Sequence, residues 1–88
     1  YARLRLYLIH VYTSIGAPHI WNGEEMGMWG ADDPHPRKPL MWQEFTFTPE
    51  RRNNFQPNSS DEKDSVQFNQ AHFDFYKKLI SLRKNNPV

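Results

Sequence analysis

The first fifteen residues carry apolar side chains three and four positions apart, which is the spacing of one face of an α-helix. The main face is formed by Leu4, Leu8, Val11 and Ile15, and it is widened by Leu6 and Ile9. Because the apolar surface extends so far round the cylinder, this helix needs burial on more than one side. Gly16 suits the left-handed backbone that often ends a helix, and Pro18 cannot continue one. We therefore predict a helix over residues 1–15.

A short apolar run, residues 17–21, follows this helix and is bounded by Gly16 and by Asn22-Gly23. Such a run is typical of one brief buried strand. No other segment has a clear strand pattern, yet a parallel strand needs neighbours to satisfy its backbone groups. The missing neighbours indicate that the chain belongs to a larger sheet.

Residues 22–64 are predicted to form one long irregular loop. Glycine and proline recur through it, at Gly23, Gly27, Gly30, Pro34, Pro36, Pro39, Pro49 and Pro57. Connections in compact domains usually have about 4–6 residues, and much longer ones are commonly functional or disordered. The length alone leaves both possibilities open.

A second helix is predicted over residues 65–84. Asp64 followed by Gln67 resembles a capping box, with Ser59 and Glu62 as an alternative, earlier start. The apolar stripe consists of Val66, Phe73, Tyr76, Leu79 and Ile80. Basic residues crowd the last turn, where cations suit the helix dipole, and Pro87 prevents continuation.

The composition excludes several classes of protein. With 38% hydrophobic and 24% charged residues, the chain is too apolar for a disordered segment and too charged for a membrane protein. A net charge of +1 without basic clusters argues against nucleic acid as a partner. There is no cysteine, and the four histidines show no paired ligand spacing, so we predict no metal and no cofactor. His19 and His35 are assigned no role.

The order helix, short strand, long loop, helix is one repeat of an alternating α/β barrel or a doubly wound sheet. The chain itself is then mainly helical. It begins at Tyr1 without methionine or signal peptide, so we expect the gene product to start upstream.

Three motifs in this order resemble the α-amylase superfamily of glycoside hydrolases. Residues 16–28 resemble the signature around the eighth barrel strand, although Asn22 stands where a second aromatic residue is usual. The pattern Asp-Pro-x-x-Arg-x-Pro-x-x-Trp from Asp33 to Trp42 is similar to the neopullulanase and cyclomaltodextrinase branch. Residues 75–87 resemble the eighth barrel helix.

This resemblance implies a (β/α)8 TIM barrel for the parent domain. Residues 1–88 would be its C-terminal portion: the end of the seventh helix, the eighth strand, a long loop and the eighth helix. The implied activity is hydrolysis of an α-glucan such as starch, maltodextrin, cyclodextrin or pullulan with retention of anomeric configuration. The family's three catalytic carboxylates lie on strands four, five and seven. They would precede Tyr1, so we expect residues 1–88 alone to be inactive.

The resemblance also implies which residues of the loop contact substrate. Asp33 and Arg37 would bind glucose, since a carboxylate and a guanidinium can hydrogen-bond pairs of sugar hydroxyls. The alternative is that the two side chains pair with each other and brace the loop. We include Trp42 among the substrate contacts, because an indole plane suits the apolar face of a sugar ring. Packing is the alternative for Trp21, Trp29 and Trp42 alike.

Glu24 and Glu25 are adjacent carboxylates, which suggests a catalytic pair at first sight. Glycosidases, however, hold two carboxylates roughly 5–10 Å apart across the scissile bond, and sequence neighbours rarely converge on one site in that way. We expect both to support the barrel rim.

Two other hypotheses remain open from the sequence. The chain can be an independent, non-catalytic sugar-binding or assembly module, or a complete small interaction domain. In isolation, the wide apolar surface of the first helix predicts self-association.

Overall fold

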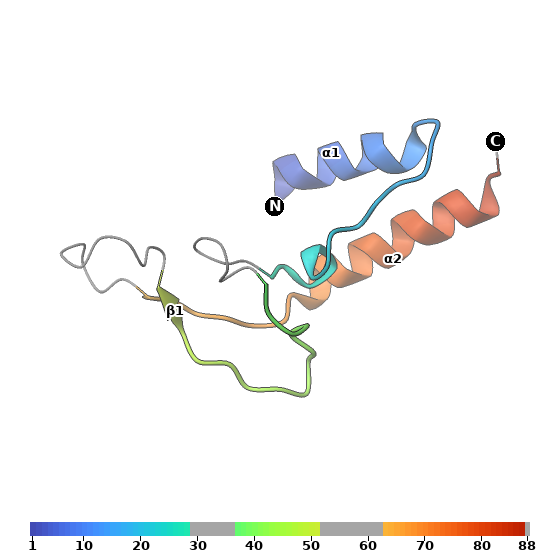
Figure 1. The fold of residues 1–88 in the computed structure, drawn as a ribbon. Helices are drawn as coiled ribbons and strands as arrows, with labels where there is room; N and C mark the ends of the chain where they lie inside the picture. The colour runs from blue at the N-terminus through green and yellow to red at the C-terminus, as the bar shows by residue number, and fades with distance from the viewer. Residues whose placement is uncertain (29–36, 52–62, 88) are drawn as a thin grey trace.

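The computed structural model describes residues 1–28, 37–51 and 63–87. Its elements are α1 (Ala2–Thr13), a 3-10 turn η1 (Glu24–Met26), β1 (Glu50–Arg51), β2 (Lys63–Asp64) and α2 (Gln70–Asn85). The two helices lie side by side and run in the same direction (Figure 1). The segment between α1 and η1, residues 14–23, runs in the opposite direction and is called the return segment. The described chain is therefore mainly helical, as predicted.

Helix α1 ends at Thr13, two residues before the predicted boundary of residue 15. Ser14 leaves the helix with φ −84° and ψ 159°, while its backbone N–H and its hydroxyl both donate to the carbonyl of His10. Gly16 has the expected positive φ, 114°, but it lies in the turn after the cap. The serine side chain thus ends the helix before the glycine is reached.

The predicted strand over residues 17–21 is not formed, which corrects the sequence analysis. These residues run as a stretched coil between α1 and η1 (Figure 1). Within the described ranges, no neighbouring strand lies beside them to supply the backbone partners that a strand requires. The hydrophobic run was typical of a strand, but strand formation depends on residues outside the run.

Helix α2 begins at Gln70, five residues later than predicted, and ends at Asn85. The Asn69 side chain accepts a hydrogen bond from the His72 backbone N–H at 3.0 Å, so Asn69 is the N-cap. The backbone N–H of Asn69 donates to the carbonyl of Met26 at 3.0 Å. The capping box proposed for Asp64 and Gln67 is wrong, because Asp64 pairs in β2 instead.

The loop between η1 and α2 is not wholly irregular. β1 and β2 pair antiparallel, with Glu50 opposite Asp64 and Arg51 opposite Lys63. The Lys38 ammonium pairs with the partly buried carboxylate of Glu50. These contacts bring two parts of the loop together that the glycine and proline pattern did not connect.

One small core joins the helices. It consists of Leu8 and Tyr12 from α1 with Tyr76 and Leu79 from α2, and Ile20 of the return segment packs against it. The rings of Tyr12 and Tyr76 meet edge to face, with centroids 6.2 Å apart. Apolar side chains on the rest of α1 stay exposed: Leu4, Leu6, Tyr7 and Ile9. Only one side of α1 is therefore buried.

Two arginines link the ends of the helix pair. The Arg5 guanidinium of α1 lies 5.2 Å from the centre of the Phe75 ring of α2. At the other end, Arg83 of α2 donates to the carbonyls of Tyr12 and Ser14, at 2.9 and 3.0 Å, and to that of Gly16. Neither described helix is long and apolar enough to cross a membrane.

Candidate functional site

The turn η1 joins the return segment to the loop, and two left-handed glycines bracket it. Gly23 has φ 91° and Gly27 has φ 73°. A Cβ atom on Gly23 would lie 2.6 Å from the Met28 sulfur, and one on Gly27 would lie 2.8 Å from the Tyr1 hydroxyl. Both positions therefore require glycine for backbone conformation and for close packing. The glycines fix where the two glutamates between them lie.

Glu24 makes structural contacts. Its Oε2 accepts a hydrogen bond from the Trp21 backbone N–H at 3.1 Å. Burial raises the pKa of the Tyr76 hydroxyl, and the negative charge of Glu24 and hydrogen bonding to its side chain raise it further. The Glu24 carboxylate thus ties the turn to the return segment and to α2.

Glu25 has different surroundings. It is half-buried, and its Oε2 is fully buried without a hydrogen-bond partner among the described residues. It lines an open pocket of about 450 Å³ together with His19, Ile20, Trp21 and Asn22. The rings of His19 and Trp21 lie 6.3 Å apart, and Trp21 is 67% exposed. This pocket combines an aromatic plane with hydrogen-bonding groups.

His72 is buried beneath η1 and is 1% exposed. Its ring packs against Tyr1 and Tyr76, with centroid distances of 4.9 and 5.1 Å. Burial lowers the pKa of His72 and the nearby Arg5 charge lowers it further, while a hydrogen bond with the Glu24 backbone partly opposes both. Sequence reasoning missed this residue. Its spacing of four from Tyr76 was the available signal, because such positions share a helix face.

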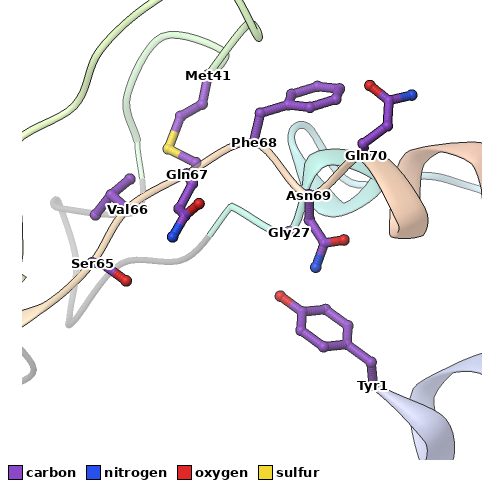
Figure 2. A pocket seen from close by; sticks show the side chains of 9 residues that line it. All are labelled: Tyr1, Gly27, Met41, Ser65, Val66, Gln67, Phe68, Asn69 and Gln70. Atoms are coloured by element: carbon purple, nitrogen blue, oxygen red, sulfur yellow. The ribbon is translucent and has the colours of Figure 1, made fainter.

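A second pocket, also of about 450 Å³, lies where α2 begins (Figure 2). It is lined by Tyr1, Gly27, Met41 and the consecutive residues 65–70. Figure 2 shows the Tyr1 hydroxyl, the Gln67 amide and the Asn69 amide directed toward a shared space. No sequence pattern indicated this pocket, because its walls come from four separate segments.

The predicted substrate contacts are only partly described. Arg37 is exposed at the start of the second described range. Trp42 is 44% exposed and lies in a turn, where its carbonyl accepts from the Phe45 N–H at 3.1 Å. Asp33 lies outside the described residues, as do Trp29 and His35. The expected proximity of Asp33 and Arg37 therefore stays a prediction.

Metal-binding chemistry has no support in the described ranges, where no three histidine, cysteine, aspartate or glutamate side chains gather. What the ranges contain is a helix, a return segment, a long loop and a parallel second helix. This order matches one unit of an alternating α/β domain except that residues 17–21 form no strand, and the loop lies beside the N-terminus of α2 (Figure 1).

The whole chain, residues 1–88, matches the model of the α-amylase catalytic domain, and the chain belongs to this family. It is similar to a cyclomaltodextrinase of Thermoanaerobacter pseudethanolicus, with 36% identity over 85 residues. It is also similar to neopullulanase 2 of Thermoactinomyces vulgaris, with 34% identity over 82 residues. These alignments cover 97% and 93% of the chain.

The chain spans only about a tenth of the length of these relatives, 11% and 10% respectively. No solved structure matches it significantly. Membership of the family implies a TIM barrel for the parent domain.

Proposed function

We propose that this chain is the C-terminal portion of the catalytic barrel of an α-glucan hydrolase that retains anomeric configuration. The observation that carries the proposal is the family match along all 88 residues. The names of the two relatives, cyclomaltodextrinase and neopullulanase, support an α-glucan as substrate. In this proposal α1 is the end of the seventh barrel helix, residues 17–21 occupy the eighth strand and α2 is the eighth helix.

The loop after the return segment is the proposed substrate-contacting part. In a (β/α)8 barrel the active site lies at the C-terminal ends of the strands, beside the N-termini of the helices that follow them. The loop lies at that end of α2 (Figure 1). Arg37 and Trp42 are exposed there and can donate to sugar hydroxyls and stack on a sugar ring. Asp33 is proposed as the carboxylate partner of the same site.

Catalysis is assigned to residues outside this chain. A retaining glycosidase uses one carboxylate as nucleophile and another as acid and base, roughly 5 Å apart across the bond. Glu24 is engaged with the Trp21 backbone and lies next to Glu25 in the same turn, so the two are proposed as non-catalytic residues of the barrel rim, with Glu24 bracing it. The 88 residues by themselves should release no reducing sugar from maltodextrin.

Substitution of Arg37 tests the substrate-contacting role. In the full-length protein that carries this chain, Arg37→Gln should raise the KM for maltooligosaccharides about tenfold or more, because charge-assisted hydrogen bonds contribute about 1.5–3 kcal/mol. Arg3→Gln, which changes an exposed arginine on α1, is the matched control and should leave KM unchanged. Equal KM values for both variants would remove Arg37 from the substrate site.

The exposed Trp21 and Trp42 favour one alternative, an independent sugar-binding module. Titration calorimetry of the 88-residue chain with maltoheptaose separates the two proposals. Binding at millimolar affinity or better supports the module. An absence of heat supports a segment that binds sugar only within its barrel.

A further inference from the structure

We infer that Trp21 is a further substrate-contacting residue, a stacking platform for one glucose ring, and that Glu25, Asn22 and His19 hydrogen-bond the hydroxyls of that ring. This inference rests on the proposed function and deepens it. It assigns to the substrate site a face of the return segment that is separate from Arg37 and Trp42.

The first step is the direction of the side chains. Ile20 packs against the core formed by α1 and α2. His19 and Trp21 flank it in sequence and are both exposed. Along an extended chain successive side chains point to opposite sides, so His19 and Trp21 share the side that faces away from the helices. In a barrel, the side opposite the helices is the interior.

The second step is the position of Trp21 along the segment. Its carbonyl accepts from the Glu24 N–H at 3.0 Å, so Trp21 is the last residue before the chain turns into η1. Side chains low in a barrel interior fill its packed core, whereas those at the C-terminal ends of strands border the active site. Trp21 therefore belongs to the uppermost interior layer, and His19 lies one layer below it.

The third step is the chemistry of the pocket. A simple filler of the barrel core would be surrounded by branched apolar residues, but this pocket also includes Asn22 and Glu25. Glu25 is partly exposed and lines the pocket, whereas its Oε2 is buried, so the other carboxylate oxygen is the one that would accept from a ligand. A carboxylate repels anionic ligands and accepts from hydroxyl groups. With an indole plane beside it, the pocket suits a neutral ligand that has many hydroxyls and an apolar ring face.

The size of the pocket agrees with such a ligand. Its volume of about 450 Å³ lies within the range of roughly 300–1,000 Å³ that is usual for small-molecule sites. The His19 ring stands 6.3 Å from the Trp21 ring and borders the same space. Stacking on Trp21 then places the ring edge, with its hydroxyls, within reach of the polar groups.

The test uses the full-length protein and a sulfur-linked maltooligosaccharide that resists hydrolysis. Trp21→Leu should weaken binding roughly five- to tenfold, and Trp21→Phe less than threefold, because phenylalanine keeps an aromatic plane. Glu25→Gln keeps the shape of the side chain, should weaken binding about threefold and serves if the leucine variant does not fold. Tyr7→Leu, which removes an aromatic residue that is 64% exposed on α1, is the control and should leave binding unchanged.

Thermal unfolding without ligand separates contact from packing. If Trp21 and Glu25 contact substrate and do not hold the fold together, their variants should unfold at midpoints near that of the wild type. Unchanged binding in Trp21→Leu and Glu25→Gln would overturn the inference, and so would weaker binding that only accompanies a lower unfolding midpoint. If the wild type neither binds nor hydrolyses an α-glucan, the proposed function itself fails. That result differs from one in which the wild type binds the sugar and the variants bind it equally well.

Discussion

Single residues in and around η1 have roles that their neighbours in sequence do not reveal. Glu24 and Glu25 are adjacent and chemically identical, yet one bonds to the Trp21 backbone while the other has a buried oxygen without a partner among the described residues. The left-handed glycines on both sides of the turn create this difference, because they fix the direction of each side chain. Adjacent carboxylates in such a turn serve separate purposes.

Protonation of His72 should destabilise the folded chain. Its pKa is lowered in the folded state, mainly by burial, whereas the unfolded value is about 6.5. Below that value the unfolded state binds more protons, so stability is complete above about pH 6.5 and is lost as pH falls through the folded pKa. The free energy of unfolding, measured by urea denaturation, should decrease between pH 7 and pH 5.

Two variants test whether His72 causes this pH dependence of stability. His72→Phe should flatten it between pH 7 and pH 5, because the titrating group is removed while an aromatic ring remains between Tyr1 and Tyr76. His10→Gln changes an exposed histidine of α1 and should preserve it. An unchanged slope in His72→Phe would show that another group titrates.

Elements show which parts of the fold could be predicted from the sequence. Both helices could, because their apolar stripes follow the helical period and each makes its own backbone hydrogen bonds. The strand over residues 17–21 could not, because a strand depends on neighbours, and the described residues supply none beside it. The start of α2 was misplaced for a related reason: Asn69 caps the helix while its backbone bonds to Met26, a residue more than forty positions earlier.

The candidate site, too, was only partly predictable from the sequence. Motif spacing proposed Arg37 and Trp42, which stay predictions, and periodicity does not show where a side chain in a long loop points. The pocket around Trp21 and Glu25 depends on a turn geometry that only the structure reveals. His72 was overlooked because one histidine on an apolar stripe looks like any packed residue.

Arg83 is expected to be the main polar link between the two helices. Its guanidinium donates to three carbonyls, that of Tyr12 in the last turn of α1 and those of Ser14 and Gly16 just beyond it. Arg83→Met should lower the free energy of unfolding by about 1–3 kcal/mol, because hydrogen bonds from a charged donor are lost. Arg83→Lys should keep only part of the stability that Arg83→Met loses, since an ammonium lacks the planar fork of a guanidinium.

Lys84→Met is the matched control for Arg83, because it removes an exposed cation from the same turn. Urea denaturation should show a stability close to that of the wild type. Equal losses in Arg83→Met and Lys84→Met would mean that net charge, and not the carbonyl contacts, is responsible.

At the scale of the whole molecule, the chain has less core than its apolar residues require. Among the described residues the buried cluster comprises four side chains, while Leu6 is 70% exposed and Leu4, Tyr7 and Ile9 of the same helix are also exposed. Extensive exposed apolar surface favours association. The 88-residue chain should therefore form oligomers at micromolar concentration in sedimentation velocity. Leu6→Glu should shift it toward monomer, and a monomeric wild type would contradict this expectation.

The most direct test of the proposed function is the anomeric form of the first product. The full-length protein that carries this chain should be incubated with maltotriose and followed by proton NMR within the first minutes, before mutarotation. A retaining α-glucan hydrolase releases the α-anomer first, because the glycosyl group is inverted twice through a covalent intermediate. Early accumulation of the α-anomer is the predicted result. Early accumulation of the β-anomer, or no cleavage of maltotriose, cyclodextrin or pullulan, would contradict the proposal.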